Sequence, residues 1–312
     1  MVVVLEVGVH PCRKAKMQPA KAIDRRSFLF MNSSQSGTLY IVATPIGNLG
    51  DLSPRAIDTL REVSLIACED TRHSRKLLDH FHIDCPLLPY HEHSDPRSGE
   101  KILKKLLGGE DIALISDAGT PLISDPGYKL VKHVRAEGCP VVPIPGACAA
   151  IAALSVSGLA TNSFRFCGFL PVKKAHRCRT LQSLVSETDT LVFYEAPHRI
   201  LDSLADMAEV FGPDRHVVMA RELTKAYETV LQGTLEVLLQ RVGQDSNQQR
   251  GEIVLIVEGN QQEQCIDAEK QRQVLTLLMA ELPLKRAVAL TAEIVGGEKK
   301  LLYKLGLELQ GK

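Results

Sequence analysis

Tryptophan is absent from this chain of 312 residues, and aromatic residues make up only 4% of it. A surface that binds single-stranded nucleic acid by stacking bases needs many aromatic side chains, so such a platform is disfavoured. The formal net charge is zero, which argues against a surface coated in basic charge. No apolar run approaches the roughly 18 residues of a membrane span. We therefore predict a soluble globular protein with no membrane partner, in which any contact with nucleic acid is local.

Common metal and nucleotide motifs are also missing. The eight cysteines include no C-x-x-C pair and no Cys/His cluster, which disfavours a zinc site and a disulfide framework. We expect no bound metal and a reducing, cytoplasmic compartment. The chain contains no P-loop, no G-x-G-x-x-G after its first apolar run and no G-x-S-x-G elbow. A P-loop NTPase is therefore disfavoured.

The N-terminal segment 1–36 differs from the rest of the chain. Residues 13–26 hold six basic side chains against the single acid Asp24. We expect a disordered extension, or a start assigned too early with Met31 as the true start; a basic targeting peptide is the alternative. The folded pattern begins at Gly37.

Short apolar runs alternate with helical patterns between residues 37 and 158. The apolar runs lie at 38–44, 65–68, 86–90, 111–116 and 140–144. The helical patterns begin at Pro54, after the cap Ser53, and continue at 71–80, 97–108 and 127–137. This alternation predicts an α/β domain with a mostly parallel sheet and helices on both faces.

The pattern changes in a second predicted α/β domain, residues 159–262. Its strands are expected at 164–169, 190–196, 216–223, 227–233 and 251–259. Two of them follow each other without a helix, which predicts an antiparallel pair in a mixed sheet. Residues 268–312 form a small helical module with segments 270–281, 284–295 and 298–309, a pattern compatible with a helix-turn-helix.

Three loops rich in glycine and proline follow predicted strands, at 44–51, 116–127 and 143–147. Ligands of parallel α/β sheets bind beyond the carboxyl ends of the strands. Glycine allows close approach of the backbone, and proline stiffens the loop. The loops therefore predict a site for a small ligand.

Seven motifs carry a resemblance to a known family. They are, in order, LYIVATPIGNLGDLSPRA, ACEDTRHSRKLL, ALISDAGTPLISDPG, VVPIPGACAAIAALSVSGL, FCGFLP, VFYEAPHRI and MARELTKAYE. From residue 37 to about 310, the chain resembles the tetrapyrrole-methylase-like superfamily of class III S-adenosylmethionine (SAM) methyltransferases. Within it, the chain is similar to bacterial enzymes that methylate ribose in small-subunit ribosomal RNA.

The resemblance implies two α/β domains with SAM in the cleft between them, and a homodimer. It implies cofactor contacts at the following positions: Pro45, Gly47, Asp117, Ala118, Gly119, Asp125, Pro145, Gly146, Gly168, Phe169 and Leu170. Loop 44–51 would line the acceptor side. An alternative for Asp125 is the N-cap of the following helix.

The same resemblance implies 2′-O-methylation of a cytidine in the decoding centre of 16S ribosomal RNA, on the assembled small subunit. Methyl transfer to a hydroxyl is an in-line displacement that depends on positioning and desolvation, and a base would help it. Candidates for acid/base groups are Glu69, Asp70, Glu195, His198, Glu222 and Lys225. The sequence does not choose among them.

Contact with RNA requires local positive charge. Four basic residues, Lys173, Lys174, Arg177 and Arg179, lie within 171–179 without an acid. Arg72 and Arg75 form a second patch. Such runs predict phosphate contacts, with a solvated helix face as the alternative.

Two other functions stay open. One is a tetrapyrrole methylase acting on a small molecule, which needs neither the basic segment nor the appended helices. The other is a non-catalytic ribosome assembly factor, which the intact glycine- and proline-rich loops disfavour.

Overall fold

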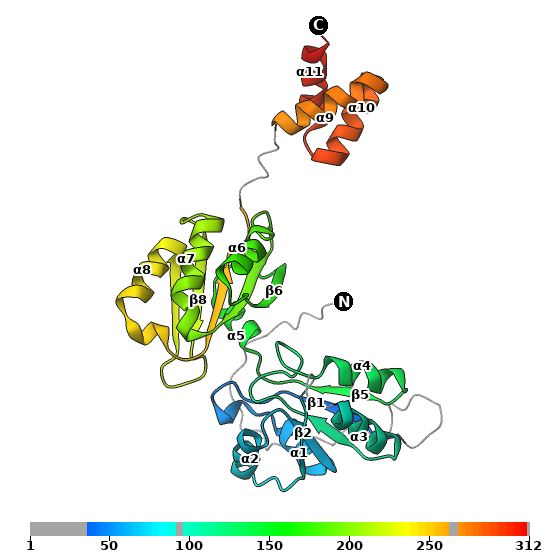
Figure 1. Ribbon diagram of the computed structural model, residues 1–312, viewed down its shortest axis with the longest axis vertical. Helices are drawn as coiled ribbons and strands as arrows, with labels where there is room; N and C mark the ends of the chain where they lie inside the picture. The colour runs from blue at the N-terminus through cyan, green and yellow to red at the C-terminus, as the bar shows by residue number, and fades with distance from the viewer. Residues whose placement is uncertain (1–35, 92–95, 262–267, 311–312) are drawn as a thin grey trace, which may run out of the picture. The chain divides into compact units, whose positions relative to one another are not determined.

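A computed structural model describes residues 36–91, 96–261 and 268–310 (Figure 1). The predicted extension 1–36 lies almost entirely outside the described residues. In Figure 1 the first sheet and its helices run from blue to green, the second from green to orange, and the C-terminal helices from orange to red.

The first sheet is parallel throughout. Its strands, in the order β3-β2-β4-β1-β5, are β3 (Leu87–Pro89), β2 (Leu65–Cys68), β4 (Ile112–Leu114), β1 (Leu39–Val42) and β5 (Val141–Ile144). All four residues of β2 are buried, as expected for a strand covered on both faces. The predicted parallel sheet is confirmed.

Helices cover both faces of this sheet. Two cores are packed by α1 (Pro54–Glu62) and α2 (Thr71–His80) on one face, and by α3 (Pro96–Leu107) and α4 (Tyr128–Ala136) on the other. The predicted cap Ser53 accepts a hydrogen bond from the N–H of Ala56 at 3.1 Å. Asp125 is not a helix cap: α4 is capped by Gly127, and no side chain caps it.

The second sheet is mixed, with the order β6-β7-β10-β8-β9. Its strands are β6 (Phe164–Phe169), β7 (Thr190–Glu195), β10 (Ile253–Val257), β8 (His216–Arg221) and β9 (Thr229–Thr234). Only β6 and β7 pair in parallel, and the predicted antiparallel pair is β8 with β9. The last strand in sequence, β10, is central and stands out in orange among the green and yellow strands (Figure 1).

Alternation along the strands divides this sheet between two cores. Leu191 and Phe193 face the core shared with α6 (Lys174–Gln182), α7 (Ile200–Phe211) and α8 (Leu235–Gln244). Val192 and Val254 face the opposite core, which α5 (Ala149–Val156) covers.

The C-terminal helices are α9 (Ala268–Glu281), α10 (Leu284–Val295) and α11 (Lys299–Leu309), close to the predicted segments. They share their own core around Leu275, Ala287 and Leu302. Within the described residues, no helix is both long enough and apolar enough to cross a membrane.

Candidate active site

A cavity of about 420 Å³ is bordered by loops of the first sheet and by strands of the second. Its lining residues are Ile46, Asp117–Thr120, Ile123–Asp125, Ala149, Phe169, Tyr194–Pro197, Ala220, Leu223 and Glu252–Val254. This volume lies within the range of about 300–1,000 Å³ found for small-molecule sites.

The loops after β1 and β4 are held together by backbone hydrogen bonds. The N–H of Thr44 donates to the carbonyl of Gly119 at 2.8 Å, and the reverse bond measures 3.1 Å. Gly119 has a φ of +83°, and a Cβ there would meet the side chain of Ile46 at 3.4 Å. Glycine thus lets the backbone form the cavity wall in a conformation that other residues rarely adopt.

Two carboxylates line this wall. Burial raises the pKa of Asp125 to about 6; a hydrogen bond with Ser116 lowers the pKa, while the charges of Glu69 and Asp117 raise it. Asp117 accepts a hydrogen bond from the N–H of Asp70 at 3.2 Å. A cationic ligand in the cavity would therefore be favoured by the local charge.

The opposite wall is largely apolar. Tyr194, on β7, accepts a hydrogen bond from the N–H of Ala150 at 3.2 Å, and burial raises the pKa of its hydroxyl. The ring of Phe169 packs edge-on against Tyr194, with centroids 5.6 Å apart, and stays 54% exposed. Two aromatic side chains thus line the cavity on this side.

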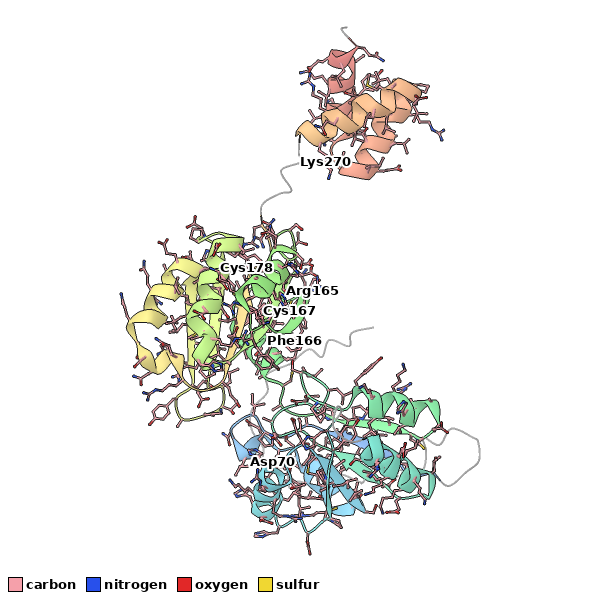
Figure 2. The ribbon with its side chains drawn as sticks, viewed as in Figure 1. Asp70, Arg165, Phe166, Cys167, Cys178 and Lys270 are labelled. Atoms are coloured by element: carbon pink, nitrogen blue, oxygen red, sulfur yellow. The ribbon has the colours of Figure 1, made fainter. Side chains whose placement is uncertain are left out.

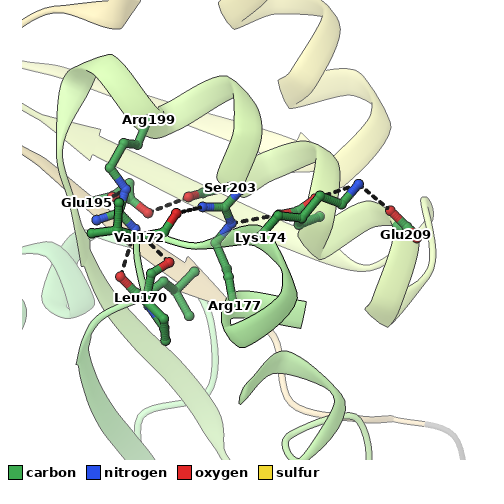
Figure 3. Close-up of polar contacts among 10 residues, drawn as sticks. Leu170, Val172, Lys174, Arg177, Glu195, Arg199, Ser203 and Glu209 are labelled. Carbon is green, nitrogen blue, oxygen red and sulfur yellow. Dashed lines mark hydrogen bonds and ion pairs between the residues drawn. The ribbon is translucent and has the colours of Figure 1, made fainter. Parts of the chain in front are cut away.

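Glu195 lines the cavity but is engaged in a buried network (Figure 3). Its carboxylate accepts the hydroxyl of Ser203 and the N–H of Ala196, and forms an ion pair with Arg199 at 3.4 Å. Arg199 donates to the carbonyls of Leu170 and Pro171 at 2.7 and 3.3 Å. Glu195 therefore orients Arg199, and Arg199 fixes the segment that follows Phe169.

Arg177 fixes the next residue of that segment. It donates to the carbonyl of Val172 at 3.0 Å and to the carboxylate of Asp206 at 2.6 Å (Figure 3). Lys174 reaches the same Asp206 at 3.3 Å and Glu209 at 3.1 Å. Two paired arginines thus hold three consecutive carbonyls. We call these arginines, with Glu195 and Asp206, the arginine clamp.

The loop after β8 carries another charged cluster. Lys225 is bound by Glu222 at 2.8 Å and by Glu252 at 3.0 Å. Burial lowers the pKa of Lys225, but the two carboxylates outweigh it and raise the pKa overall. Burial raises the pKa of Glu222, and the hydrogen bonds from Lys225 and from the backbone of Glu252 bring it below its ordinary value. Both groups are therefore held in their charged forms.

The structure brings together some of the predicted cofactor residues. Those that line the cavity are Asp117, Ala118, Gly119, Asp125 and Phe169. Those outside the lining are Pro45, Gly47, Pro145, Gly146, Gly168 and Leu170. Two of these glycines lie where a side chain would not fit: a Cβ on Gly47 would lie 2.4 Å from Cγ of Lys225, and one on Gly146 would lie 2.9 Å from Cβ of Ala43.

The acid/base candidates are spread more widely. Glu195 reaches the cavity; Glu222 and Lys225 lie beside its lining residues Leu223 and Glu252. His198 is exposed on the turn before α7. Asp70, labelled in Figure 2, caps α2 with its carboxylate. Lining residues such as Tyr194 on β7 and Val254 on β10 were not predicted. These strands are apolar at nearly every position, and consecutive residues of each line the cavity, so the sequence pattern carries no signal for them.

The predicted basic residues differ in exposure. Lys173, at the N-cap of α6, and Lys174 and Arg179 within that helix are exposed, whereas Arg177 is only 3% exposed within the clamp. Arg72 is exposed and Arg75 is half-buried, and both line a shallow hollow with Thr71. No group of three or more potential metal ligands gathers among the residues that the structure describes.

We compared the chain with models of known protein families. Residues 38–239 match the model of the Tetrapyrrole (Corrin/Porphyrin) Methylases, which covers the cavity loops and most of both sheets.

The chain belongs to the tetrapyrrole methylase family.

Residues 266–310 match a second model, the RsmI C-terminal HTH domain. Among the curated relatives of this methylase, a protein of Pseudomonas aeruginosa is 57% identical over 280 residues. The match covers 89% of this chain and 99% of that relative. One from Escherichia coli O157:H7 is 52% identical over 279 residues, which cover 89% and 97%. Both are named Ribosomal RNA small subunit methyltransferase I.

A solved cobalamin biosynthetic enzyme, cobalt precorrin-4 methyltransferase, shares the fold. The match has a TM-score of 0.54 at 14% identity and covers 71% of this chain and 94% of that one. Enzymes of the tetrapyrrole methylase family use SAM as the methyl donor. The predicted family, fold class and cofactor are confirmed.

Proposed function

We propose that this protein uses SAM to methylate small-subunit ribosomal RNA, at the 2′-hydroxyl of a cytidine in the decoding centre of the assembled subunit. The observation that carries the proposal is the extent of its likeness to proteins named for that RNA: more than half of the residues are identical, over nearly their whole length. The match includes the C-terminal module, which lies outside the methylase model.

The cavity residues fit the cofactor. SAM combines a flat purine, a polar sugar and two positive centres. The aromatic face of Phe169 suits the purine. Asp117 and Asp125 suit the positive centres, and the backbone at Ala118 and Gly119 can hydrogen-bond the polar groups. We propose these five residues as its principal contacts.

The bound cofactor would supply an activated methyl group for an in-line displacement by the acceptor oxygen. This chain's part is to hold the two reactants in line and to exclude water. Glu195 is committed to Arg199 and Ser203, and Lys225 is held protonated between two carboxylates. We therefore propose that Glu195 positions the Phe169 segment and that Lys225 acts as a positive charge beside the acceptor, not as a base.

Exposed basic residues would guide the RNA. Lys173, Arg179 and Arg72 are exposed and can reach phosphates, although Arg72 also pairs with Asp70 at 3.5 Å. Arg177 instead serves the clamp. A homodimer is also part of the proposal. Apart from Ser155, α5 consists of apolar residues, and its Ile151 and Val156 are exposed, so a second chain could cover them.

The test is transfer of a radiolabelled methyl group from SAM. The acceptors are unmethylated small ribosomal subunits, naked 16S RNA and a tetrapyrrole precursor. We expect an alkali-resistant ribose methyl on subunit RNA, and loss of SAM binding in Asp117→Ala. Label only on the tetrapyrrole, or SAM binding without transfer to RNA, would refute the proposal.

A further inference from the structure

The loop Glu222–Glu228, between β8 and β9, holds its backbone in strained conformations. Glu222 and Thr224 have φ values of +51° and +67°, a backbone conformation that residues other than glycine rarely adopt. Such strain persists only where the surroundings enforce it, and it is concentrated at functional sites.

The surroundings of this loop do enforce it. Arg221, itself 7% exposed, donates to the carbonyl of Tyr227 at 3.0 Å. The N–H of Thr224 donates to Glu228 at 2.6 Å, and the N–H of Lys225 donates to the carbonyl of Glu222 at 3.0 Å. The loop is thus a rigid support whose shape exists before any ligand binds.

The loop borders the cavity. Leu223 lines the cavity, as does Glu252, the partner of Lys225. The stem of Lys225 lies against Gly47, in the loop expected on the acceptor side. An acceptor held beside Lys225 would therefore meet this loop.

One residue of the loop stays exposed although its backbone is hydrogen-bonded. Tyr227 is 76% exposed, although its carbonyl accepts a hydrogen bond from the buried Arg221. A tyrosine on a rigid backbone offers a flat face at a small cost in conformational entropy, since only two side-chain torsions must be fixed. Any nucleobase can stack on an aromatic ring, and one such contact strengthens the affinity for nucleic acid measurably.

We propose that Tyr227 stacks on an unpaired nucleobase of the acceptor RNA strand, at or next to the methylated nucleoside. The inference rests on the proposed function, because it assumes an RNA acceptor. It requires a single stacked base and no extended aromatic platform, in agreement with the scarcity of aromatic residues.

The absence of tryptophan allows a direct optical test. Tyr227→Trp places a single tryptophan in the full chain, and stacking on a base should quench its emission when unmethylated small subunits are added. The matched control is Tyr128→Trp, at the exposed start of α4, where the side chain is 63% exposed and should not be quenched.

Kinetics provide the second readout. Tyr227→Ala should raise the KM for small subunits about tenfold or more, with the affinity for SAM unchanged. Tyr227→Phe keeps the ring and should retain the wild-type KM. An unchanged KM in Tyr227→Ala, or equal quenching at positions 227 and 128, would overturn the inference while wild-type methylation of RNA still upheld the proposed function. If the wild-type chain transfers no methyl group to RNA, both fail.

Discussion

Asp125 shows how one residue couples the cavity to stability. Its carboxyl binds a proton more tightly in the folded chain, with a pKa of about 6, than at its ordinary value of 3.8. The unfolded state therefore loses its proton first as pH rises. The free energy of unfolding falls between these two values and stays lower above them.

Asp125→Asn removes this titration. We expect the variant to be more stable than the wild type at pH 7, by about 1 kcal/mol once solvent screening of this half-buried group is allowed for. The gain should vanish near pH 4. Thermal unfolding measured across this pH range gives the comparison, with Asp58→Asn on the exposed face of α1 as the control. Equal pH profiles for Asp125→Asn and the wild type would contradict the expectation.

The surroundings of such charged residues could be predicted from the sequence only in part. Asp117 and Asp125 were recognisable because they lie in a loop after a strand, and that loop does line the cavity. Arg177 was grouped with its basic neighbours, but the fold buries it against Asp206 from another helix. Linear charge patterns cannot reveal a partner 29 residues away, so a buried ion pair looks like an exposed patch.

At the scale of elements, the arginine clamp joins the end of β6 to α6 and α7. Its carboxylates Glu195 and Asp206 are at most 4% exposed in their side chains. Removing one partner of a buried ion pair leaves an uncompensated charge, which costs about 3–5 kcal/mol. The clamp should therefore matter far more for stability than the number of its ion pairs suggests.

We expect Arg199→Ala to lower the free energy of unfolding by about 3 kcal/mol or more in urea titrations. Arg199→Lys keeps the charge but not the planar guanidinium, whose Nη2 reaches both carbonyls while Nε lies beside Glu195. It should therefore lose less stability and still bind SAM more weakly. The control is Arg165→Ala, in β6 (Figure 2), which breaks an exposed pair with Glu187 and should cost no more than about 1 kcal/mol. Equal losses in Arg199→Ala and Arg165→Ala would contradict the role of the clamp.

Elements were the most predictable level. Short runs gave β2 and β6 to the residue. β2 is buried and apolar along its whole length, whereas β6 is a largely exposed edge strand whose phenylalanines are typical of strands. The order of strands was not predictable. β10 enters between β7 and β8, and that choice depends on which strand edges are open, not on any local pattern.

At the scale of the whole molecule, the chain is neutral but its basic residues gather locally. Lys173, the N-cap of α6, and Arg179, within that helix, are both exposed and lie close in sequence to the cavity residue Phe169. Phosphate contacts release counterions, so binding that depends on them weakens as salt rises.

Reversing both charges, Lys173→Glu with Arg179→Glu, should weaken binding to small subunits and reduce the slope of log affinity against log salt by about 2. The affinity for SAM should not change. Filter binding over a range of salt concentrations gives the slopes. A control pair on α3, Lys101→Glu with Lys104→Glu, introduces the same charge on another exposed face. Identical slopes in the two pairs would remove α6 from the interface.

The central position of β10 has a consequence for how the protein is made. Until Val257 has left the ribosome, β7 and β8 each expose an open edge where β10 will pair. Open edges invite pairing with other chains, so a nascent or prematurely terminated chain is prone to aggregate. The second half of the molecule must therefore wait for its last strand, and the cavity, which needs Ile253 and Val254, is completed only then. A protein that we propose to act on small-subunit RNA would thus complete its candidate cofactor site late in its own synthesis on a ribosome.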